Sequence, residues 1–405
     1  MTPEVKERIE QLRHGIVPDG YKKTAAGIIP VDWQCSTIRD CLQIKNNERK
    51  PISEEVRKTI PGPYPYYGPT QAQGFIDTFV SEGLAVLIGE DGDHFLKYKD
   101  KPMTLLVDGQ YTVNNHAHMV VGTKKCTTKW FSYAYQHKSL LNAITRQGAG
   151  RYKLTKEALE KLFVQYPCLE EQRILIDIIS AQDKVIELKE KLLAEKQRQK
   201  KYLMQQLLTG KKRLPGFDGE WMYVRANQIF RNVTDKKHNG TLEVLSATQD
   251  RGIIPRSLVD IDIKYAKESL TGYKKVVKGN FVISLRSFQG GIEYSEYSGI
   301  VSPAYTVLSS IYPIEDNYYK QFFKSTDYIN RLNIAVYGIR DGKQISYNDF
   351  GRIRIPYPPL DEQKAIAAVL ETADKEIEIL KRNIEQEKQK KKALMQLLLT
   401  GIVRV

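Results

Sequence analysis

A direct repeat is the feature of this 405-residue sequence that most restricts how it can fold. Residues 166–210 and 357–401 align without a gap at a constant offset of 191 positions (357 minus 166). Both copies open with Pro-x-Leu-[Glu/Asp]-Glu-Gln and close with Leu-Met-Gln-x-Leu-Leu-Thr-Gly. Because self-similarity at a fixed spacing marks a repeated structural unit, the fold is expected to contain the same element twice.

Each copy is predicted to form one long helix. A proline and acidic residues open the segment, as the positive end of the helix dipole favours, and a glycine closes it. In the second copy, apolar residues recur at steps of three and four, as in a helix that packs along a seam: Ile366, Val369, Ala373, Ile377, Leu380 and Ile384, resumed at Leu394 and Leu398. The first copy has a looser seam: Ile178, Ile186, Leu193, Leu203 and Leu207.

The two helices are expected to pair with each other and to run antiparallel. The region between them is long enough for one domain, and the first and last residues of a domain usually lie close together. Helix two should therefore begin where helix one ends. The predicted division is an N-terminal segment 1–22 that joins the distal end of the C-terminal helix, a domain at 23–165, a helix at 166–210, a second domain at 211–356 and a second helix at 357–405.

Both domains are predicted to be rich in strands. Short apolar runs broken by glycine indicate strands in each, and each domain carries a late helical stretch that is rich in aromatic residues. The interiors of the two domains are far less alike than the two helices. The expected fold class is therefore α+β: two strand-rich α+β domains separated by two long antiparallel coiled-coil helices, with approximate two-fold symmetry.

The charge of the chain favours a polyanionic partner. It has 62 Lys and Arg against 48 Asp and Glu, a formal net charge of +14, and such an excess binds phosphates by releasing their counterions. No apolar run approaches the ~18 residues of a membrane span, and the start shows no signal-peptide pattern. The four scattered cysteines argue against a disulfide framework or a cysteine-bound zinc, so a reducing cytoplasmic location is expected.

The sequence resembles the specificity (S) subunit of type I restriction–modification systems. The resemblance rests on the paired opening and closing motifs and on Gly-x-Ile-Pro-x-x-Trp at 27–33, and it covers essentially the whole chain. It implies that the two domains are target recognition domains, each of which reads one half of a bipartite double-stranded DNA target. It also implies that the helices set the spacer between the halves and dock two methyltransferase (M) subunits.

The same resemblance implies where the chemistry resides. S-adenosylmethionine, ATP and Mg belong to partner subunits, so this chain is expected to be non-catalytic and to need no cofactor or metal. Restriction (R) subunits join through the complex of two M subunits and one S subunit. The first domain resembles one type of recognition domain through Tyr66-Tyr67-Gly68 and Asn114-Asn115-His116, and the second resembles another type through Arg286-Ser287-Phe288-Gln289. The target should therefore not be a palindrome.

Candidate DNA contacts are the residue types that read bases and phosphates. Arg, Lys, Asn and Gln in loops read base edges, whereas basic glycine-rich loops suit phosphate. The candidates in the first domain are Tyr66, Tyr67, Gln71, Gln73, Asn115, His116, Arg146, Arg151 and Lys153; those in the second are Arg286, Ser287, Gln289, Arg340 and Lys343. The alternatives are a core position for Tyr67, a turn cap for Asn115 and plain surface turns for the basic loops.

The residues that follow each helix-opening proline are predicted to combine helix N-terminal chemistry with partner docking. They are Leu169, Glu171, Gln172, Leu360, Glu362 and Gln363.

Motifs for catalysis are missing. The sequence has no Gly-x-x-x-x-Gly-Lys-[Ser/Thr] loop, and Tyr357-Pro358-Pro359-Leu360 lacks the polar and aromatic residues of an amino-methyltransferase motif. His116 and His118 could share a strand face as metal ligands, but no third ligand is evident. The acidic run at 90–93 could suggest a nuclease, although a tight turn is favoured. The rival functions are a fused restriction–methylation enzyme, a stand-alone DNA-binding relative and a coiled-coil scaffold without a DNA role.

Overall fold

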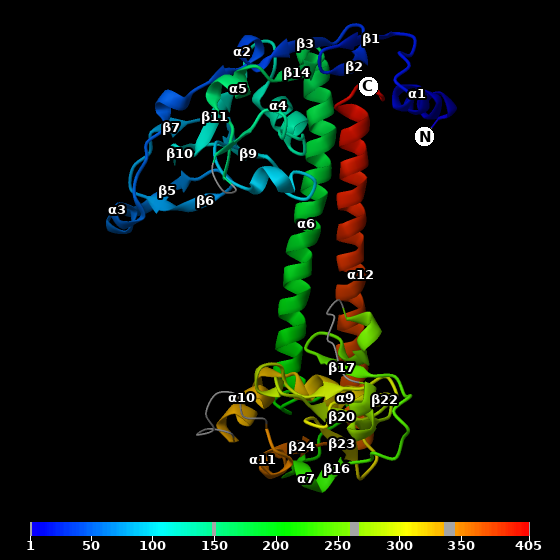
Figure 1. Ribbon diagram of the computed structural model, residues 1–405. Helices are drawn as coiled ribbons and strands as arrows, with labels where there is room; N and C mark the ends of the chain where they lie inside the picture. Colours follow the sequence, from blue (N-terminus) through cyan, green and yellow to red (C-terminus); the bar gives the residue numbers. More distant parts are fainter. Residues whose placement is uncertain (1, 148–150, 260–266, 336–344, 405) are drawn as a thin grey trace. The chain divides into compact units, whose positions relative to one another are not determined.

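The computed structural model describes residues 2–147, 151–259, 267–335 and 345–404 (Figure 1). The chain divides into two compact units: unit 1 comprises Met1–Leu188 and Ile384–Val405, and unit 2 comprises Lys189–Asn383. Each unit therefore holds one domain and parts of both long helices. In the described part of the chain, none of the helices has the length and apolar character needed to cross a membrane.

The repeated segments form the two longest helices, α6 (Leu169–Leu207) and α12 (Leu360–Leu398), of 39 residues each. Both end as the sequence predicts, because Gly210 (φ +69°) and Gly401 (φ +70°) adopt the left-handed conformation that closes a helix. The preceding threonines, Thr209 and Thr400, donate their hydroxyls to carbonyl oxygens four residues earlier. The two copies of the repeat therefore share their ends as well as their length.

The two helices run antiparallel where they pack together inside each unit, as predicted. In both units, residue numbers rise along α6 as they fall along α12. The polar pairs that establish this direction are Glu171–Arg404 and Gln182–Glu387 in unit 1, and Lys196–Glu376 and Lys200–Asp374 in unit 2.

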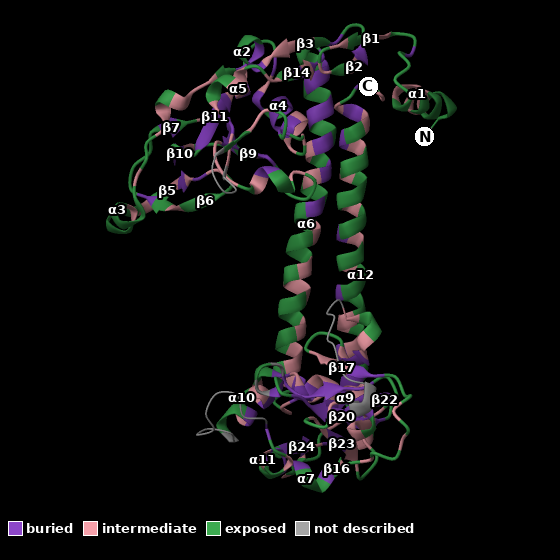
Figure 2. Cartoon of the chain, viewed as in Figure 1, coloured by how far each residue is buried: buried purple, intermediate pink, exposed green. Residues whose placement is uncertain are grey.

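The apolar seam of α6 differs from the predicted one near its start. Ile178 is 36% exposed, whereas Leu175, Ile176 and Ile179 are buried. The reason is that these turns pack mainly on the domain of unit 1, whose core includes Trp130 and shares one cluster with them. Figure 2 shows the same change along α6, with buried residues in its first turns and mostly exposed residues in its middle.

The elements of unit 1 besides the long helices are α1 (Pro3–Arg13), β1 (Tyr21–Thr24), β2 (Gly27–Pro30), β3 (Gln34–Thr37), α2 (Ile38–Cys41), β4 (Gln43–Ile44), α3 (Glu54–Thr59), β5 (Pro61–Tyr67), β6 (Ala72–Ile76), β7 (Ser81–Glu82), β8 (Ala85–Gly89), β9 (Thr104–Val107), β10 (Gln110–Val113), β11 (Ala117–Val121), α4 (Thr128–Tyr135), β12 (Thr145–Gln147), β13 (Arg151–Lys153), α5 (Lys156–Glu160) and β14 (Phe163–Tyr166).

Two four-stranded sheets form the domain of unit 1, with strand orders β4-β11-β8-β9 and β6-β5-β10-β7. Alternate residues of β8 point to opposite faces, so that Val86 and Ile88 join the core against α4 while Ala85 and Leu87 join a second apolar cluster. Strand β8 is therefore buried on both sides. The turn that follows β8 therefore starts from a strand that is buried in the core.

The N-terminal segment returns to the end of α12. Tyr21 donates its hydroxyl to the carbonyl oxygen of Gly401 at 2.6 Å, and Arg8 binds the carbonyl oxygen of Ile402. A side chain at position 401 would collide with Pro30, since an added Cβ would lie 2.5 Å from its Cγ. The Gly-x-Ile-Pro-x-x-Trp motif therefore serves to seat the end of α12.

The elements of unit 2 besides the long helices are β15 (Met222–Arg225), α7 (Ala226–Ile229), β16 (Phe230–Val233), β17 (Leu245–Thr248), β18 (Gly252–Pro255), β19 (Lys274–Val276), β20 (Phe281–Ile283), α8 (Ser287–Gly290), β21 (Glu293–Tyr294), β22 (Gly299–Val301), β23 (Thr306–Ser310), α9 (Asp316–Phe323), α10 (Thr326–Ala335), α11 (Tyr347–Arg352) and β24 (Arg354–Tyr357).

The domain of unit 2 centres on the sheet β16-β23-β20-β21 and on a cluster of aromatic side chains. Phe230 lies at its middle, with ring centroids 5.5 Å from Phe281, 5.2 Å from Tyr319 and 5.5 Å from Phe323. The first turns of α12 join this core through Ile366 and its neighbours. Both units are α+β, which confirms the predicted fold class.

Candidate nucleic-acid interface

Three loops of the domain in unit 1 meet at one edge. Backbone hydrogen bonds join Glu90 N to His116 O (2.7 Å) and Gly92 N to Tyr152 O (3.0 Å). These bonds tie the turn after β8 to the turn between β10 and β11 and to the β12–β13 hairpin. The exposed residues Asn115 and His116 therefore lie on the same surface as the basic hairpin, as a shared DNA contact requires.

Arg49 fixes the turn that carries Asn115. Its Nη1 donates to the carboxylate of Glu90 (2.8 Å) and to the backbone oxygens of Asn115 (3.1 Å) and Ala117 (3.2 Å). Its side chain is 19% exposed and that of Glu90 is 17% exposed. The sequence gives no sign of this role, because Arg49 lies in a polar run and its partners follow 40 or more positions later.

The acidic and histidine residues of this edge are engaged within the chain. Glu90 also pairs with Lys153 (3.6 Å), and the Nδ1 of His116 lies 3.0 Å from Asp91. His118 is buried between the carbonyl oxygen of Leu154 and the amide of Asn46, and this burial lowers its pKa. Among the residues that the structure describes, no three His, Cys, Asp or Glu side chains gather as a metal site.

Tyr66 is a core residue and does not make the predicted DNA contact. It is 1% exposed, and its hydroxyl accepts a hydrogen bond from Ile52 N (2.8 Å) and donates one to Lys50 O (3.2 Å). Tyr67 is half-buried against Tyr111, with ring centroids 5.9 Å apart. The core alternative therefore describes Tyr67 in large part, and Tyr66, for which no such alternative was expected, is fully buried.

The glutamines of the β5–β6 hairpin remain candidates. Gln71 and Gln73 are exposed, and Gln73 accepts a hydrogen bond from the Asn114 side chain at 3.2 Å. This contact connects the hairpin to the turn that carries Asn115. The exposed polar candidates of this part of unit 1 are Gln71, Gln73, Asn115 and His116.

The basic hairpin is described in part. Arg146 is exposed, and Lys153 keeps 32% of its side-chain surface beside Glu90. The side chain of Arg151 and the loop 148–150 lie outside the described residues.

In unit 2, the turn after β20 carries the candidates. Arg286 and Gln289 are exposed, whereas Ser287 is 1% exposed and its hydroxyl accepts a hydrogen bond from Ser284 N at 2.8 Å. Ser287 therefore shapes the turn and lacks the exposed side chain that the predicted DNA contact requires. Packing requires a glycine at position 291 (φ +82°), since an added Cβ would lie 2.1 Å from the carbonyl oxygen of Phe323.

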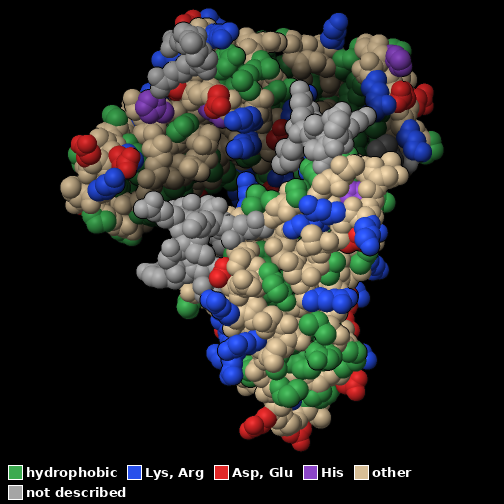
Figure 3. Space-filling view, turned by 60° about the horizontal axis from the view of Figure 1, so that its bottom comes forward, with side chains coloured by type: hydrophobic (Ala, Val, Ile, Leu, Met, Phe, Trp, Pro, Cys, Tyr) green, Lys and Arg blue, Asp and Glu red, His purple; other side chains and the backbone are tan. Residues whose placement is uncertain are grey.

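The predicted phosphate contacts Arg340 and Lys343 lie outside the described residues. On the face that Figure 3 displays, lysine and arginine side chains are scattered over much of the surface, with acidic side chains among them. This distribution agrees with the positive net charge of the chain.

The Glu of each helix-opening motif forms a buried ion pair inside its own unit. Glu362 is completely buried and receives two hydrogen bonds from Arg213, Nε to Oε1 at 2.5 Å and Nη2 to Oε2 at 2.6 Å. Glu171 receives the same two bonds from Arg404, at 2.7 and 2.8 Å. Both pairs are related by the 191-residue offset, so the repeat extends to the contacts. We call each pair the helix clamp.

The Gln of each motif holds the domain against the long helix. Gln172 accepts a hydrogen bond from Thr127 N (2.9 Å), the residue that caps α4. Gln363 accepts one from Glu315 N (2.9 Å), the residue that caps α9. Both glutamines also donate to backbone oxygens of the helix-opening segment.

These contacts differ from the predicted partner docking of the motif. Glu171, Gln172, Glu362 and Gln363 are at most 8% exposed and bind within the chain, so they form no surface for a partner. Leu169 is 43% exposed and Leu360 is half-buried, and the docking prediction therefore rests on these two.

The chain matches the family model for the type I restriction modification DNA specificity domain twice, over residues 30–197 and 219–388. A putative type I restriction enzyme specificity subunit of Haemophilus influenzae is 27% identical over 362 residues, which cover 84% of this chain and 87% of that protein. The putative type I restriction enzyme MjaX specificity subunit of Methanocaldococcus jannaschii is 25% identical over 435 residues, which cover 96% and 97%.

Solved structures show the same fold. The S subunit of a type I restriction–modification system from M. genitalium aligns with a TM-score of 0.56 at 14% identity, over 90% of this chain and 96% of that one. A chain from a study of complex assembly and conformational transition in a type I restriction–modification system aligns with a TM-score of 0.55 at 17% identity, over 93% and 99%.

Proposed function

Because the chain belongs to the family of type I restriction–modification DNA specificity subunits, we propose that each of its domains reads one half of a bipartite, non-palindromic DNA target. The observation that carries the proposal is the contrast between the two long helices with their repeated contacts, which we call the frame, and the two domains. The helix clamps repeat at the 191-residue offset and the glutamines of the two motifs make corresponding contacts, whereas the strand orders and exposed loops of the two domains differ. A repeated frame with two unlike recognition surfaces suits two unlike half-sites.

The proposed partners are two methyltransferase subunits, with restriction subunits joining through the complex of two M subunits and one S subunit. Apolar side chains on the surface of α6 support a docking role, since exposed apolar patches mark interaction sites. Those of unit 1 are Leu169, Ile174, Ile178, Val185 and Leu188. In this proposal, S-adenosylmethionine, ATP and Mg are bound by the partner subunits.

The isolated chain is expected to show no methyltransferase, ATPase or nuclease activity. The reason is that the candidate catalytic groups have structural partners: Glu90 binds Arg49 and Lys153, and His118 binds Leu154 and Asn46. The measurement is methyl transfer from labelled S-adenosylmethionine to DNA, with and without added M subunits. Methylation of DNA by the chain alone would overturn the proposed function.

Single substitutions in the two domains should relax different half-sites. Arg286→Ala is expected to reduce discrimination at one half-site by about 1–3 kcal/mol, because a side chain that reads a base edge contributes that much. Asn115→Ala should do the same at the other half-site. Both residues are exposed, so the fold should survive.

The readout is the set of methylated adenines on a DNA library after reaction with the assembled complex. Each variant serves as the control for the other, since the untouched half-site must keep its sequence. Equal losses on matched and mismatched DNA would show that the substituted side chain does not read a base.

A further inference from the structure

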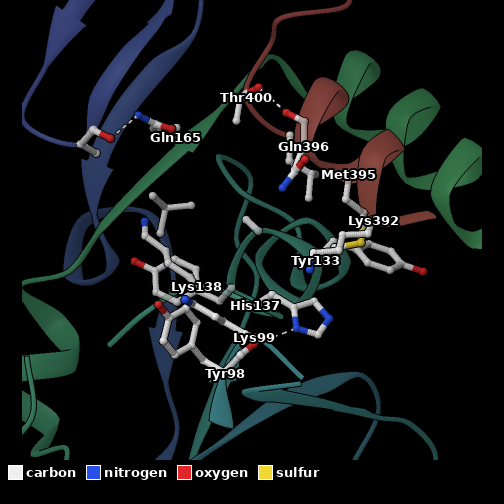
Figure 4. Close-up of a pocket in the computed structure, with 15 residues that line it drawn as sticks. Tyr98, Lys99, Tyr133, His137, Lys138, Gln165, Lys392, Met395, Gln396 and Thr400 are labelled. Carbon is white, nitrogen blue, oxygen red and sulfur yellow. Dashed lines mark hydrogen bonds between the residues drawn. The ribbon is translucent and has the colours of Figure 1, made fainter. Parts of the chain in front are cut away.

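A cavity of about 520 Å³ opens in unit 1 between the domain and the end of α12 (Figure 4). Tyr98, Tyr133 and Tyr135 line it from the domain, and Met395 of α12 and Leu399, which directly follows α12, line the other side. This volume lies within the ~300–1,000 Å³ of typical binding pockets, which combine apolar walls with a few polar groups. The pocket thus has the size and walls to hold an apolar side chain.

The rim of this pocket is positively charged. Lys99, Lys138 and Lys392 belong to its lining, and none of the described lining residues is an aspartate or a glutamate. Lys99 and Lys392 are exposed, and neither forms an ion pair with a described residue. In Figure 4 these side chains surround the opening from the domain and from α12. Positive charge at the rim is therefore available to an incoming anion.

Lys138 lies deeper than the other lysines. Its Nζ donates to the carbonyl oxygen of Phe163 (3.0 Å) and sits 4.5 Å from the ring centroid of Tyr135. Its burial lowers its pKa, since a desolvated ammonium lacks a compensating anion. A carboxylate placed in the pocket would supply that compensation.

The repeat provides an internal comparison for the apolar wall. Leu399, which directly follows α12, corresponds to Leu208, which directly follows α6, at the offset of 191. Leu208 is completely buried in a core that includes Tyr318 and Tyr319, whereas Leu399 is only half-buried at the pocket wall. The chain therefore covers this wall itself in unit 2 and leaves it open in unit 1.

We propose that the pocket of unit 1 receives an acidic segment of a methyltransferase subunit, with an apolar or aromatic anchor side chain. The anchor packs against Tyr133, Met395 and Leu399, and flanking carboxylates pair with Lys99 and Lys392. The inference rests on the proposed function and goes further, because it makes the two docking positions unequal. Binding at unit 1 depends on this charge, and binding at unit 2 does not.

The test is Lys392→Glu in the full-length chain, mixed with M subunits and followed by native mass spectrometry. Reversing an exposed charge that faces acidic groups should weaken binding at unit 1 at least about tenfold. At limiting M concentration, complexes with one M subunit should then replace complexes with two. The matched control is Lys201→Glu, which changes the equivalent exposed lysine of α6 and should leave the ratio unchanged.

A photo-crosslinking side chain at Gln396, an exposed residue of the lining, identifies the occupant. Capture of an M-subunit peptide rich in Asp and Glu supports the inference; capture of DNA, or of no M peptide, overturns it. Equal effects of the Lys392 and Lys201 variants also overturn it. If the unchanged chain binds no M subunit, the proposed function fails as well. If it binds two and Lys392→Glu binds two equally tightly, only this inference fails.

Discussion

Replacing Arg213 by methionine should lower the free energy of unfolding of unit 2 by about 3 kcal/mol. Arg213 binds both oxygens of Glu362, a completely buried carboxylate that also accepts a hydrogen bond from Trp221 Nε1 at 2.8 Å. Removal of one member of a buried ion pair leaves the other charge uncompensated, at a cost of about 3–5 kcal/mol. The expected loss is at the low end because the Arg213 side chain is 22% exposed.

Hydrogen exchange measured by mass spectrometry can assign this loss of stability to unit 2, since peptides of the two units are followed separately. Amides in the first turns of α12 should exchange roughly 100-fold faster through unfolding, because each 1.4 kcal/mol is a factor of ten. The matched variant is Arg404→Met in unit 1.

The Arg404 variant should lose less of its free energy of unfolding, about 1–2 kcal/mol, because breaking a solvated ion pair destabilises a protein less than breaking a buried one. The side chain of Arg404 is 38% exposed, and that of its second partner Asp32 is 58% exposed. A loss as large in the Arg404 variant as in the Arg213 variant would contradict burial as the cause.

Insertion of four residues into each long helix should lengthen the unread gap of the DNA target by one or two base pairs. Four helical residues add ~6 Å, and DNA rises ~3.4 Å per base pair. The insertions belong after Leu188 in α6 and after Asn383 in α12, where the chain passes between the units. The helix clamps and the ion pairs inside each unit stay intact.

Mapping of methylated adenines by the assembled complex measures the gap. Both half-sites should keep their sequences, because neither domain is changed. Four residues inserted into α6 alone are the control, and this change should impair assembly by shifting one helix past the other. An unchanged gap with full activity in the double insertion would mean that the helices do not set the spacer.

The sequence by itself determined the frame of this protein. The gap-free repeat, the acidic openings and the closing glycines predict two equal helices, and the structure has α6 at Leu169–Leu207 and α12 at Leu360–Leu398. These signals are local: a glycine cap or an apolar seam depends on residues within a few turns of itself. The antiparallel direction followed because chain length and domain size leave few ways to connect two such helices.

The roles of individual side chains depended on contacts that spacing cannot show. Glu362 belongs to a motif that indicates partner docking, yet its partner Arg213 lies 149 positions away and buries it. Tyr66 lies in a strand interrupted by glycine and prolines, which hide the alternation that turns it inward.

Only the tertiary structure decided which polar residues hold the frame together and which stay exposed. Arg49 is unremarkable in the sequence, and it acquires a role because folding brings it beside Glu90 and Asn115. The same holds for the pocket of unit 1, whose walls come from two parts of the chain that are at least 227 positions apart (392 minus 165). The physical reason is that burial and charge compensation are properties of a place in space, and residues distant in the chain create that place together.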